Sequence, residues 1–244
     1  RVLARYADAL AVRAFPKGTA WATEREDRLI KDFARFSDKP VINLESSRRH
    51  PCQALADAMT LRERLGDPRG KRFVLAWAWH PKALPTAVPA SAALAAAQLG
   101  MEVVITRPPG FDLDPEDQAL IERLAREAGG TAALCDDLEA GLAGADAVYV
   151  KSWGSLEAFG RPEEERVKSH ECKAGVLQRP SDLTKRRIAH RVRIIEQRKV
   201  RDLHAPKPVA CDHLAALPEA PLPEEPIADR VFHLETTSSN PGTA

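Results

Sequence analysis

Residues 41–66 read VINLESSRRHPCQALADAMTLRERLG, and the order of residue types predicts one strand followed by one helix. Val41–Leu44 is a short, largely apolar run of the kind found in buried strands. Pro51 suits the first turn of a helix, and Gly66 suits the position just after its end. Three apolar residues recur at roughly helical spacing and are expected to share the buried face: Leu55, Met59 and Leu65.

The same alternation extends to both sides of this stretch. Apolar runs predict four further strands, at Ala9–Val12, Phe73–Trp77, Glu102–Thr106 and Ala147–Val150. Helices are expected over about Glu24–Phe36, Ala90–Leu99, Pro115–Glu127 and Leu138–Leu142. We expect the first of these helices to begin with a capping box formed by Thr23 and Glu26. Apolar strands separated by helices indicate an α/β fold with two doubly wound, Rossmann-like parallel-sheet units that meet at Gly66–Gly70.

Composition changes near Arg161, and all the tryptophans and tyrosines precede that residue. The later segment is rich in proline and poor in large apolar residues, so it can bury little surface against its chain entropy. We therefore expect three parts: a unit over 1–66, a unit over 67–161, and a divergent or disordered tail over 162–244. The tail is basic between Arg166 and Arg201, which allows RNA or phosphate binding; a solvated charge run is the plainer interpretation.

The overall composition excludes several protein classes. The formal net charge is +1, which argues against a dedicated nucleic-acid or membrane-surface binder. No apolar run is long enough to span a bilayer. The chain has 4 cysteines and no CxxC pair, so neither a disulfide scaffold nor a structural metal site is expected. Reduced thiols are typical of the cytoplasm. The chain begins with Arg1 rather than Met, and we expect it to be a fragment or a processed product.

Polar side chains follow four of the expected strands. They are Arg13; Glu45, Ser46, Arg48, Arg49 and His50; Trp79, His80 and Lys82; and Lys151, Ser152 and Trp153. In parallel sheets, ligands bind in the crevice beyond the carboxyl ends of the strands. Four loops would then supply cations, a carboxylate and two imidazoles to one side of the molecule.

The tetrapeptide His50-Pro51-Cys52-Gln53 marks the expected helix start within these loops. There His50 and Gln53 would lie near unpaired backbone N–H groups and the positive end of the helix dipole, which suits an anion or a developing oxyanion. The alternative is that His50 only caps a helix that begins with proline. Spacing alone does not separate these two interpretations.

These residues also carry a family resemblance. Val12-Arg13-Ala14-Phe15, and Val41–Glu45 leading into His50–Ala56, resemble the carbamoyl-phosphate domain of the aspartate/ornithine carbamoyltransferase family. Two further stretches are similar to the family's members that act on N-acetylornithine: Trp79-His80-Pro81-Lys82 with Thr86-Ala87-Val88, and Tyr149–Gly154. The resemblance covers roughly residues 1–165.

The resemblance implies an activity and a set of residue roles. The reaction would transfer the carbamoyl group from carbamoyl phosphate to the δ-amine of N-acetylornithine in arginine biosynthesis, without a metal or organic cofactor, in a homotrimer. By resemblance, Arg13, His50 and Gln53 are the catalytic residues. Carbamoyl phosphate would be bound by Arg13 and by His50, Pro51, Cys52 and Gln53. N-acetylornithine would contact Glu45, Lys151 and His80. Cys52 is expected to be a small packing residue and not a nucleophile.

Two parts of the family pattern are missing from this chain. The phosphate-binding Ser-x-Arg-Thr-Arg loop is expected before Arg1. The His-Cys-Leu-Pro loop is expected after Gly160, where neither Glu171-Cys172-Lys173 nor Ala210-Cys211-Asp212-His213 matches it. The missing loops leave open a non-catalytic remnant that binds weakly or only associates with other chains. A carbamoyltransferase that acts on unmodified ornithine is a second alternative.

Overall fold

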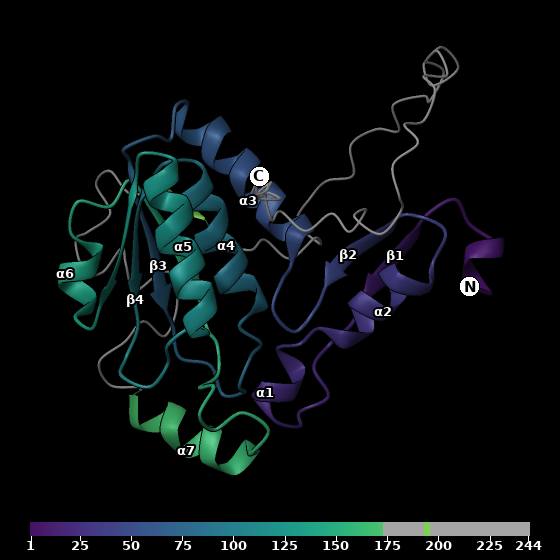
Figure 1. Ribbon diagram of the computed structural model, residues 1–244. Helices are drawn as coiled ribbons and strands as arrows, with labels where there is room; N and C mark the ends of the chain where they lie inside the picture. Colours follow the sequence, from purple (N-terminus) through teal and green to yellow (C-terminus); the bar gives the residue numbers. More distant parts are fainter. Residues whose placement is uncertain (173–192, 196–244) are drawn as a thin grey trace, which may run out of the picture.

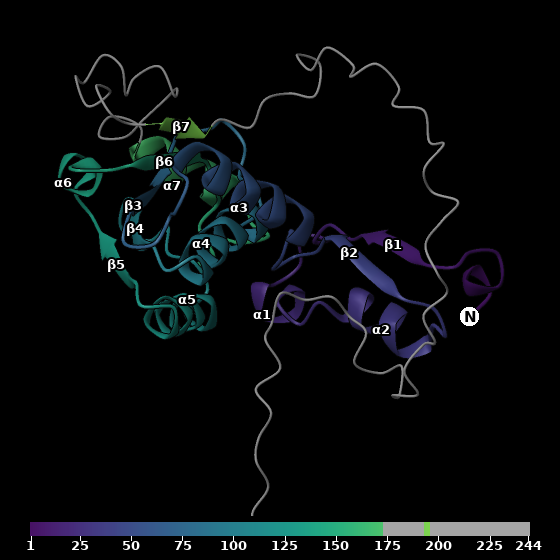
Figure 2. The same cartoon turned by 90° about the horizontal axis from the view of Figure 1, so that it is seen from above.

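The computed structural model describes residues 1–172 and 193–195 and contains two parallel sheets. A two-stranded sheet has the order β1-β2, and a five-stranded sheet has the order β5-β4-β3-β6-β7. Helix α3, Pro51–Leu65, follows β2 and lies between the two sheets (Figures 1 and 2). The predicted α/β fold with two parallel-sheet units is confirmed.

The first unit is small. After a short 3-10 helix at Leu3–Arg5, strand β1, Leu10–Arg13, pairs in parallel with β2, Val41–Glu45. The strands end together, because the backbone N–H of Ala14 donates to the carbonyl of Glu45 at 2.7 Å. The carboxyl ends of both strands, with Arg13 and Glu45, therefore lie side by side.

The second unit is built around β3, Arg72–Trp77. Its neighbours are β4, Glu102–Thr106, and β6, Ala147–Lys151; β5, Thr131–Cys135, and β7, Arg193–Ile195, lie outside them. Trp77 pairs in register with Lys151. Lys151 is thus placed at the carboxyl edge of the sheet.

Alternate residues of β3 enter two separate cores. Phe73, Leu75 and Trp77 pack in the core beneath α4, Ala87–Gln98, and α5, Pro115–Glu127. Val74 and Ala76 pack on the opposite face with α6, Leu138–Leu142. This alternation follows from the two-residue period of a strand and gives the doubly wound arrangement seen in Figure 2.

The predicted helix over Glu24–Phe36 is wrong before Arg28. The chain forms two helices, α1 at Trp21–Glu24 and α2 at Arg28–Phe36, and Thr23 lies inside α1 and caps nothing. Asp27 separates them in the left-handed region, with φ 49°. Its carboxylate accepts from Ser46 Oγ at 2.7 Å and from the Ser47 N–H at 2.9 Å. A long-range contact to the loop after β2 therefore replaces the local capping box.

The predicted buried face of α3 is wrong for Leu55 and Met59, whereas Leu65 is partly buried against the main core. Leu55 and Met59 are exposed by 57% and 54%, whereas Ala54, Asp57 and Leu61 are buried. The buried residues recur at three- and four-residue spacing and face α4, on which α3 packs. Small Ala54 and polar Asp57 conceal this face from a search for large apolar residues. Gly66 ends the helix as predicted, with φ 73°.

Two elements had no strong sequence signal. Strand β5 is an edge strand and is largely exposed, so it needs no continuous apolar run. Helix α7, Pro162–Glu171, buries none of its residues, and its first turn carries three glutamates that suit the helix dipole. The expected irregular tail is therefore wrong for 162–171; residues 173–192 and 196–244 of it lie outside the described residues. Helix α4 also begins three residues earlier than predicted, at Ala87.

The structure gives two findings that bear on membranes and metals, both for the described residues. None of the helices within 1–172 is long and apolar enough to cross a membrane. The same residues contain no group of three or more His, Cys, Asp or Glu side chains placed to hold a metal ion.

The corrected face of α3 can be tested by stability. Leu61→Ala should lower the free energy of unfolding by about 2–5 kcal/mol, because it removes a side chain that is 1% exposed. Met59→Ala, on the exposed side of the same helix, should change it by less than about 0.5 kcal/mol. Urea unfolding of both variants measures the difference. Equal losses would contradict the assignment of the buried face.

Candidate active site

The carboxylate of Glu45 brings two of the predicted site residues together. Glu45 Oε2 accepts from Arg13 Nε at 2.8 Å and lies 2.6 Å from the Arg13 terminal nitrogen. His50 Nε2 lies 3.6 Å from the same oxygen. The Glu45 side chain is only 7% exposed, while that of Arg13 is 55% exposed. The arginine can therefore contact a ligand from solvent while it stays beside the glutamate.

Lys151 comes to this cluster from the other sheet. Burial lowers the pKa of Lys151, and the charge of Glu45 opposes that shift. The charge of Lys151 acts in turn on His50. Arg13, Glu45, His50 and Lys151 thus form one group of interacting side chains at the carboxyl ends of β1, β2 and β6. We call these four residues the Glu45 cluster.

His50 is held as a neutral imidazole in this cluster. Burial lowers its pKa; Glu45 raises it, and Arg13 and Lys151 lower it further. A pKa below the usual 6.5 leaves the ring uncharged at pH 7, with one N–H donor. A neutral donor suits a carbonyl oxygen that gains negative charge during a reaction.

The backbone of His50 is fixed by a residue that sequence analysis missed. The His50 N–H donates to Ser91 Oγ on α4 at 2.9 Å, and the His50 carbonyl accepts the N–H of Ala54 in the first turn of α3. The His50 side chain makes no capping hydrogen bond. His50 thus occupies the N-cap position of α3, and its side chain lies beside Glu45 instead of capping the helix. Ser91 was detectable as the single hydroxyl residue in an alanine-rich helix.

The remaining residues of the tetrapeptide start α3. Pro51 occupies its first turn, as predicted. Cys52 is exposed, with its Sγ 3.9 Å from the Asn43 carbonyl, so the expectation of a packing residue is wrong within the described structure. Gln53 lies at the Glu45-cluster end of the helix and donates from Nε2 to Asp57 Oδ1 at 2.8 Å.

Asp57 is a buried carboxyl group that sequence analysis missed. It is 4% exposed, and burial raises its pKa to about 6. The hydrogen bonds from Gln53 and from the Tyr149 hydroxyl act in the opposite direction and favour the ionised form. Its position four residues after Gln53, one helical turn along α3, was the available signal.

Arg48 and Arg49 serve a different purpose from the one their place after β2 suggested. Both donate to Asp117 Oδ1 on α5, Arg49 at 2.7 Å, and Arg48 also pairs with Glu116. Asp117 is 2% exposed in its side chain. The two arginines therefore tie the loop after β2 to the second unit.

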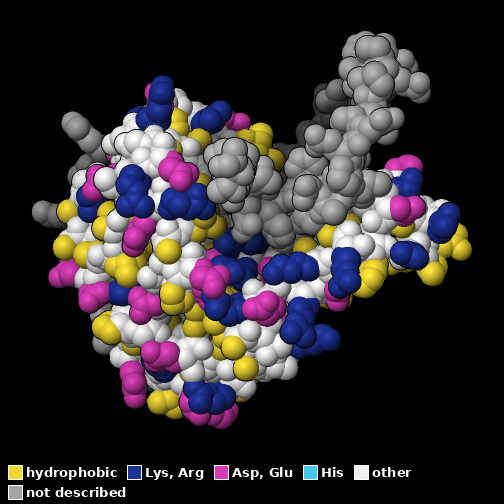
Figure 3. Space-filling model, in the orientation of Figure 1, with side chains coloured by type: hydrophobic (Ala, Val, Ile, Leu, Met, Phe, Trp, Pro, Cys, Tyr) yellow, Lys and Arg dark blue, Asp and Glu magenta, His cyan; other side chains and the backbone are white. Residues whose placement is uncertain are grey.

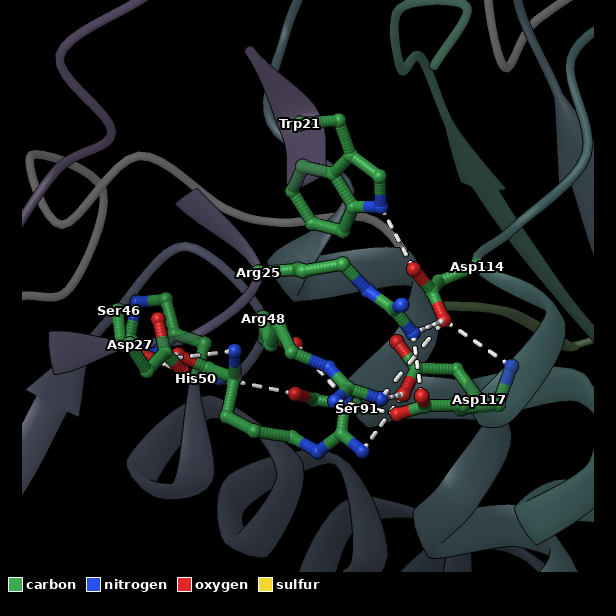
Figure 4. A network of polar contacts seen from close by, with 11 residues as sticks. Trp21, Arg25, Asp27, Ser46, Arg48, His50, Ser91, Asp114 and Asp117 are labelled. Carbon is green, nitrogen blue, oxygen red and sulfur yellow. Dashed lines mark hydrogen bonds and ion pairs between the residues drawn. The ribbon is translucent and has the colours of Figure 1, made fainter. Parts of the chain in front are cut away.

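Helix α1 contributes to the same junction. Arg25 donates to Asp114 Oδ1 at 2.9 Å, and the Trp21 indole N–H donates to Asp114 Oδ2 at 2.6 Å. Figure 4 shows these side chains converging on the start of α5. Acidic and basic side chains are interspersed across this face of the molecule (Figure 3). Opposite charges across the junction fix how the two units lie.

His80 and Trp153 lie in neighbouring strand-end loops but make contacts of their own. His80 Nδ1 is 3.0 Å from the Lys82 backbone nitrogen, and the His80 carbonyl accepts from Ser169 of α7 at 3.5 Å. Trp153 is buried, and its indole N–H donates to the Phe111 carbonyl at 2.7 Å. Both residues shape the loops, and these hydrogen bonds join them to residues outside the Glu45 cluster.

Known protein families match the chain over both units. The model described as "Aspartate/ornithine carbamoyltransferase, carbamoyl-P binding domain" matches residues 1–63, and that described as "Aspartate/ornithine carbamoyltransferase, Asp/Orn binding domain" matches residues 76–187.

Curated relatives act on several forms of ornithine. N-acetylornithine carbamoyltransferase of Xanthomonas campestris pv. campestris is 46% identical over 169 residues, which is 68% of this chain and 50% of the relative. Ornithine carbamoyltransferase of Methanoculleus marisnigri is 37% identical over 156 residues, 64% of this chain and 44% of the relative. N-succinylornithine carbamoyltransferase of Bacteroides fragilis is 34% identical over 154 residues, 63% of this chain and 45% of the relative.

Solved structures agree with these relatives. The crystal structure of an acetylornithine transcarbamylase complexed with acetylcitrulline matches with a TM-score of 0.68 and 45% identity. The match covers 70% of this chain and 52% of that one. This chain spans about half the length of the curated relatives it matches.

The raised pKa of Asp57 predicts a pH-dependent stability. The folded protein binds this proton more tightly than the unfolded chain, whose pKa stays near 3.8, so stability falls as pH rises toward and through about 6. Relative to Asp57→Asn, the unaltered chain should lose about 3 kcal/mol between about pH 4 and pH 7. Urea unfolding across that range measures this difference, in which the opposing effect of His50 cancels. A pH-independent difference would contradict the buried, titrating carboxyl group.

The junction between the units gives a second stability test. Asp117→Ala leaves the partly buried guanidinium groups of Arg48 and Arg49 without their shared carboxylate, and should cost about 3–5 kcal/mol. Glu127→Ala on the same helix removes only the exposed pair with Arg123 and should leave the unfolding free energy unchanged. Thermal or urea unfolding compares the two variants. A similar small effect from both would show that the junction does not hold the units.

Proposed function

The chain belongs to the aspartate/ornithine carbamoyltransferase family, and from that premise we propose that it supplies carbamoyl-phosphate and amino-acid binding residues of an N-acetylornithine carbamoyltransferase. In this reaction the δ-amine attacks the carbamoyl carbon. A C–N bond forms, the C–O bond to phosphate breaks, and the amine loses a proton. The observation that carries the proposal is the Glu45 cluster, which joins Arg13 and His50 from the first unit with Lys151 from the second.

We assign the carbamoyl phosphate to residues of the first unit. The exposed guanidinium of Arg13 attracts the anion, and the neutral His50 donates to the carbonyl oxygen. Gln53 meets the carbamoyl amide, while Pro51 and Cys52 place the start of α3 beside it. A preorganised donor at a carbonyl oxygen contributes about 2.7–4 kcal/mol to transition-state stabilisation. The proposed reaction uses no metal or organic cofactor, and this chain supplies part of the binding site.

The amino acid is assigned to the side of the cluster that faces the second unit. Glu45 and Lys151 offer a carboxylate and an ammonium to a substrate that carries an amine and a carboxylate. His80 is placed at the rim, because its loop is joined to the end of β6 by the hydrogen bond from Ala78 N–H to the Lys151 carbonyl at 2.9 Å. In this proposal, residues 1–66 bind carbamoyl phosphate and residues 67–161 bind the amino acid.

The cellular setting of this proposal follows from the same family membership. We place the complete enzyme in arginine biosynthesis in the cytoplasm, where the described thiols of Cys52, Cys135 and Cys172 would stay reduced. A homotrimer is the proposed assembly. The exposed Leu55 and Met59 on α3 offer an apolar surface for self-association.

Calorimetry with carbamoyl phosphate tests the first half of the proposal. The unaltered chain should bind it, and Arg13→Ala should weaken binding about tenfold or more, because a charged hydrogen bond to the anion is lost. Arg5→Ala, an exposed arginine of the same unit, is the matched control and should bind normally. Absence of binding, or normal binding by Arg13→Ala, would contradict the proposed site.

A colorimetric assay for ureido products tests the acceptor. With carbamoyl phosphate present, N-acetylornithine should give product in preference to ornithine and N-succinylornithine. Product from ornithine alone would overturn the assignment of the acceptor. Binding without product from any of the three would instead support a non-catalytic remnant.

A further inference from the structure

Two residues share one face of α3. Gln53 and Asp57 stand four residues apart, which places them on the same side of the helix. Gln53 lies in the first turn, next to His50 of the Glu45 cluster, and Asp57 lies one turn further along with its carboxyl group buried. Across from it, Tyr149 and Lys151 alternate on β6 and so point to the same side of that strand. Gln53 thus lies between the cluster and a buried pair, Asp57 and Tyr149.

The contact between Gln53 and Asp57 determines how the Gln53 amide is turned. An ionised carboxylate only accepts hydrogen bonds. The amide of Gln53 must therefore direct its Nε2 group to Asp57, as the 2.8 Å contact shows. Its carbonyl oxygen, Oε1, then points away from Asp57. Without this partner, the amide nitrogen and oxygen would be free to exchange places.

We propose that Asp57 is a positioning residue that turns the Gln53 amide so that Oε1 faces the carbamoyl NH2 group. The inference rests on the proposed function, in which Gln53 meets the carbamoyl amide. The carbamoyl NH2 group only donates, so a glutamine oxygen is the matching partner and a glutamine nitrogen would repel it.

The surroundings of Asp57 fit this role better than a purely structural one. Its carboxyl group is buried, and its partners among the described residues are the uncharged side chains of Gln53 and Tyr149. A buried carboxylate without a cation costs stability, and an apolar residue would fill the same space without that cost. The charge therefore opposes folding and serves the orientation of Gln53.

Protonation of Asp57 would remove this constraint on the amide. The raised pKa of about 6 means that a modest fall in pH adds a proton to the carboxyl group, which can then donate to Gln53 Oε1. Helix α4 carries no titratable side chain, and β2 carries Glu45 alone, which is held by Arg13. The groups that face Asp57 are thus Gln53 on its own helix and Tyr149 on β6. In acid, Gln53 can present Nε2 to the ligand.

A pair of ligands separates orientation from general binding. Phosphonoacetamide carries the amide NH2 group, and 2-oxopropylphosphonate carries a methyl group in its place. The quantity to measure by calorimetry is the ratio of their affinities, because titration of the phosphonate and of His50 affects both ligands alike. The unaltered chain should prefer the amide by up to about tenfold at pH 7.5 and lose that preference below pH 6.

Substitutions at Asp57 then test its role. Asp57→Ala should abolish the preference while leaving the affinity for 2-oxopropylphosphonate unchanged. Asp57→Asn carries both a donor and an acceptor, as the protonated acid does, so it should lack the preference at pH 7.5 as well as below pH 6. Thr60→Ala, which removes another side-chain contact on the same helix, is the control and should behave like the unaltered chain.

The outcomes separate this inference from the proposed function. If the unaltered chain binds neither ligand or does not prefer the amide, the proposed role of Gln53 is overturned, and with it the role of Asp57. If the unaltered chain prefers the amide at every pH, or if a folded Asp57→Ala keeps the preference, only the positioning role is overturned. Should Asp57→Ala fail to fold, the pH dependence of the unaltered chain against Asp57→Asn decides the matter.

Discussion

The contact of Arg48 and Arg49 with Asp117 is the constraint on which the site depends. These ion pairs hold the loop after β2 against α5, and Ser91 of α4 holds the backbone of His50 from the same side. A short two-stranded sheet has little core of its own, so its place is set by contacts with the larger unit. Because the loop is fixed, Glu45 and His50 lie close to Lys151, the last residue of β6 in the second sheet. The ion pairs of Arg48 and Arg49 with Asp117 therefore hold the two units together, although both arginines belong to the same loop as His50.

Burial and charge together set the protonation states of the cluster. Burial alone lowers the pKa of both His50 and Lys151, since it disfavours their charged forms. The carboxylate of Glu45 opposes the shift at both residues. The consequence is a neutral imidazole next to a glutamate that is already occupied by Arg13. Such a group can donate to a carbonyl oxygen without adding a further cation, and the exposed guanidinium supplies the attraction for an anion.

Local sequence signals account for most of the fold, and long-range contacts account for what they missed. Strands such as Phe73–Trp77 were predictable because they are continuous apolar runs, and α3 because proline and glycine mark its ends. The break at Asp27 was not, since its cause is a loop about twenty residues away. The largely exposed strand β5 and helix α7, which has no fully buried residue, carry no apolar period to detect.

The site was predictable to a similar degree. The carboxyl ends of parallel strands share one edge, so the residues following β1, β2 and β6 were expected to meet, and the structure brings Arg13, Glu45, His50 and Lys151 together. The position of a residue after a strand could not distinguish Arg48 and Arg49, which are bound by Asp117, from Arg13, which is exposed enough to contact a ligand. That distinction depends on partners more than sixty residues away in sequence. The direct measurement of the central claim is a crystal structure of the chain with phosphonoacetamide. The account predicts its phosphonate beside Arg13 and its carbonyl oxygen within hydrogen-bond distance of a His50 ring nitrogen; a ligand bound elsewhere, or an imidazole turned away from it, would contradict the account.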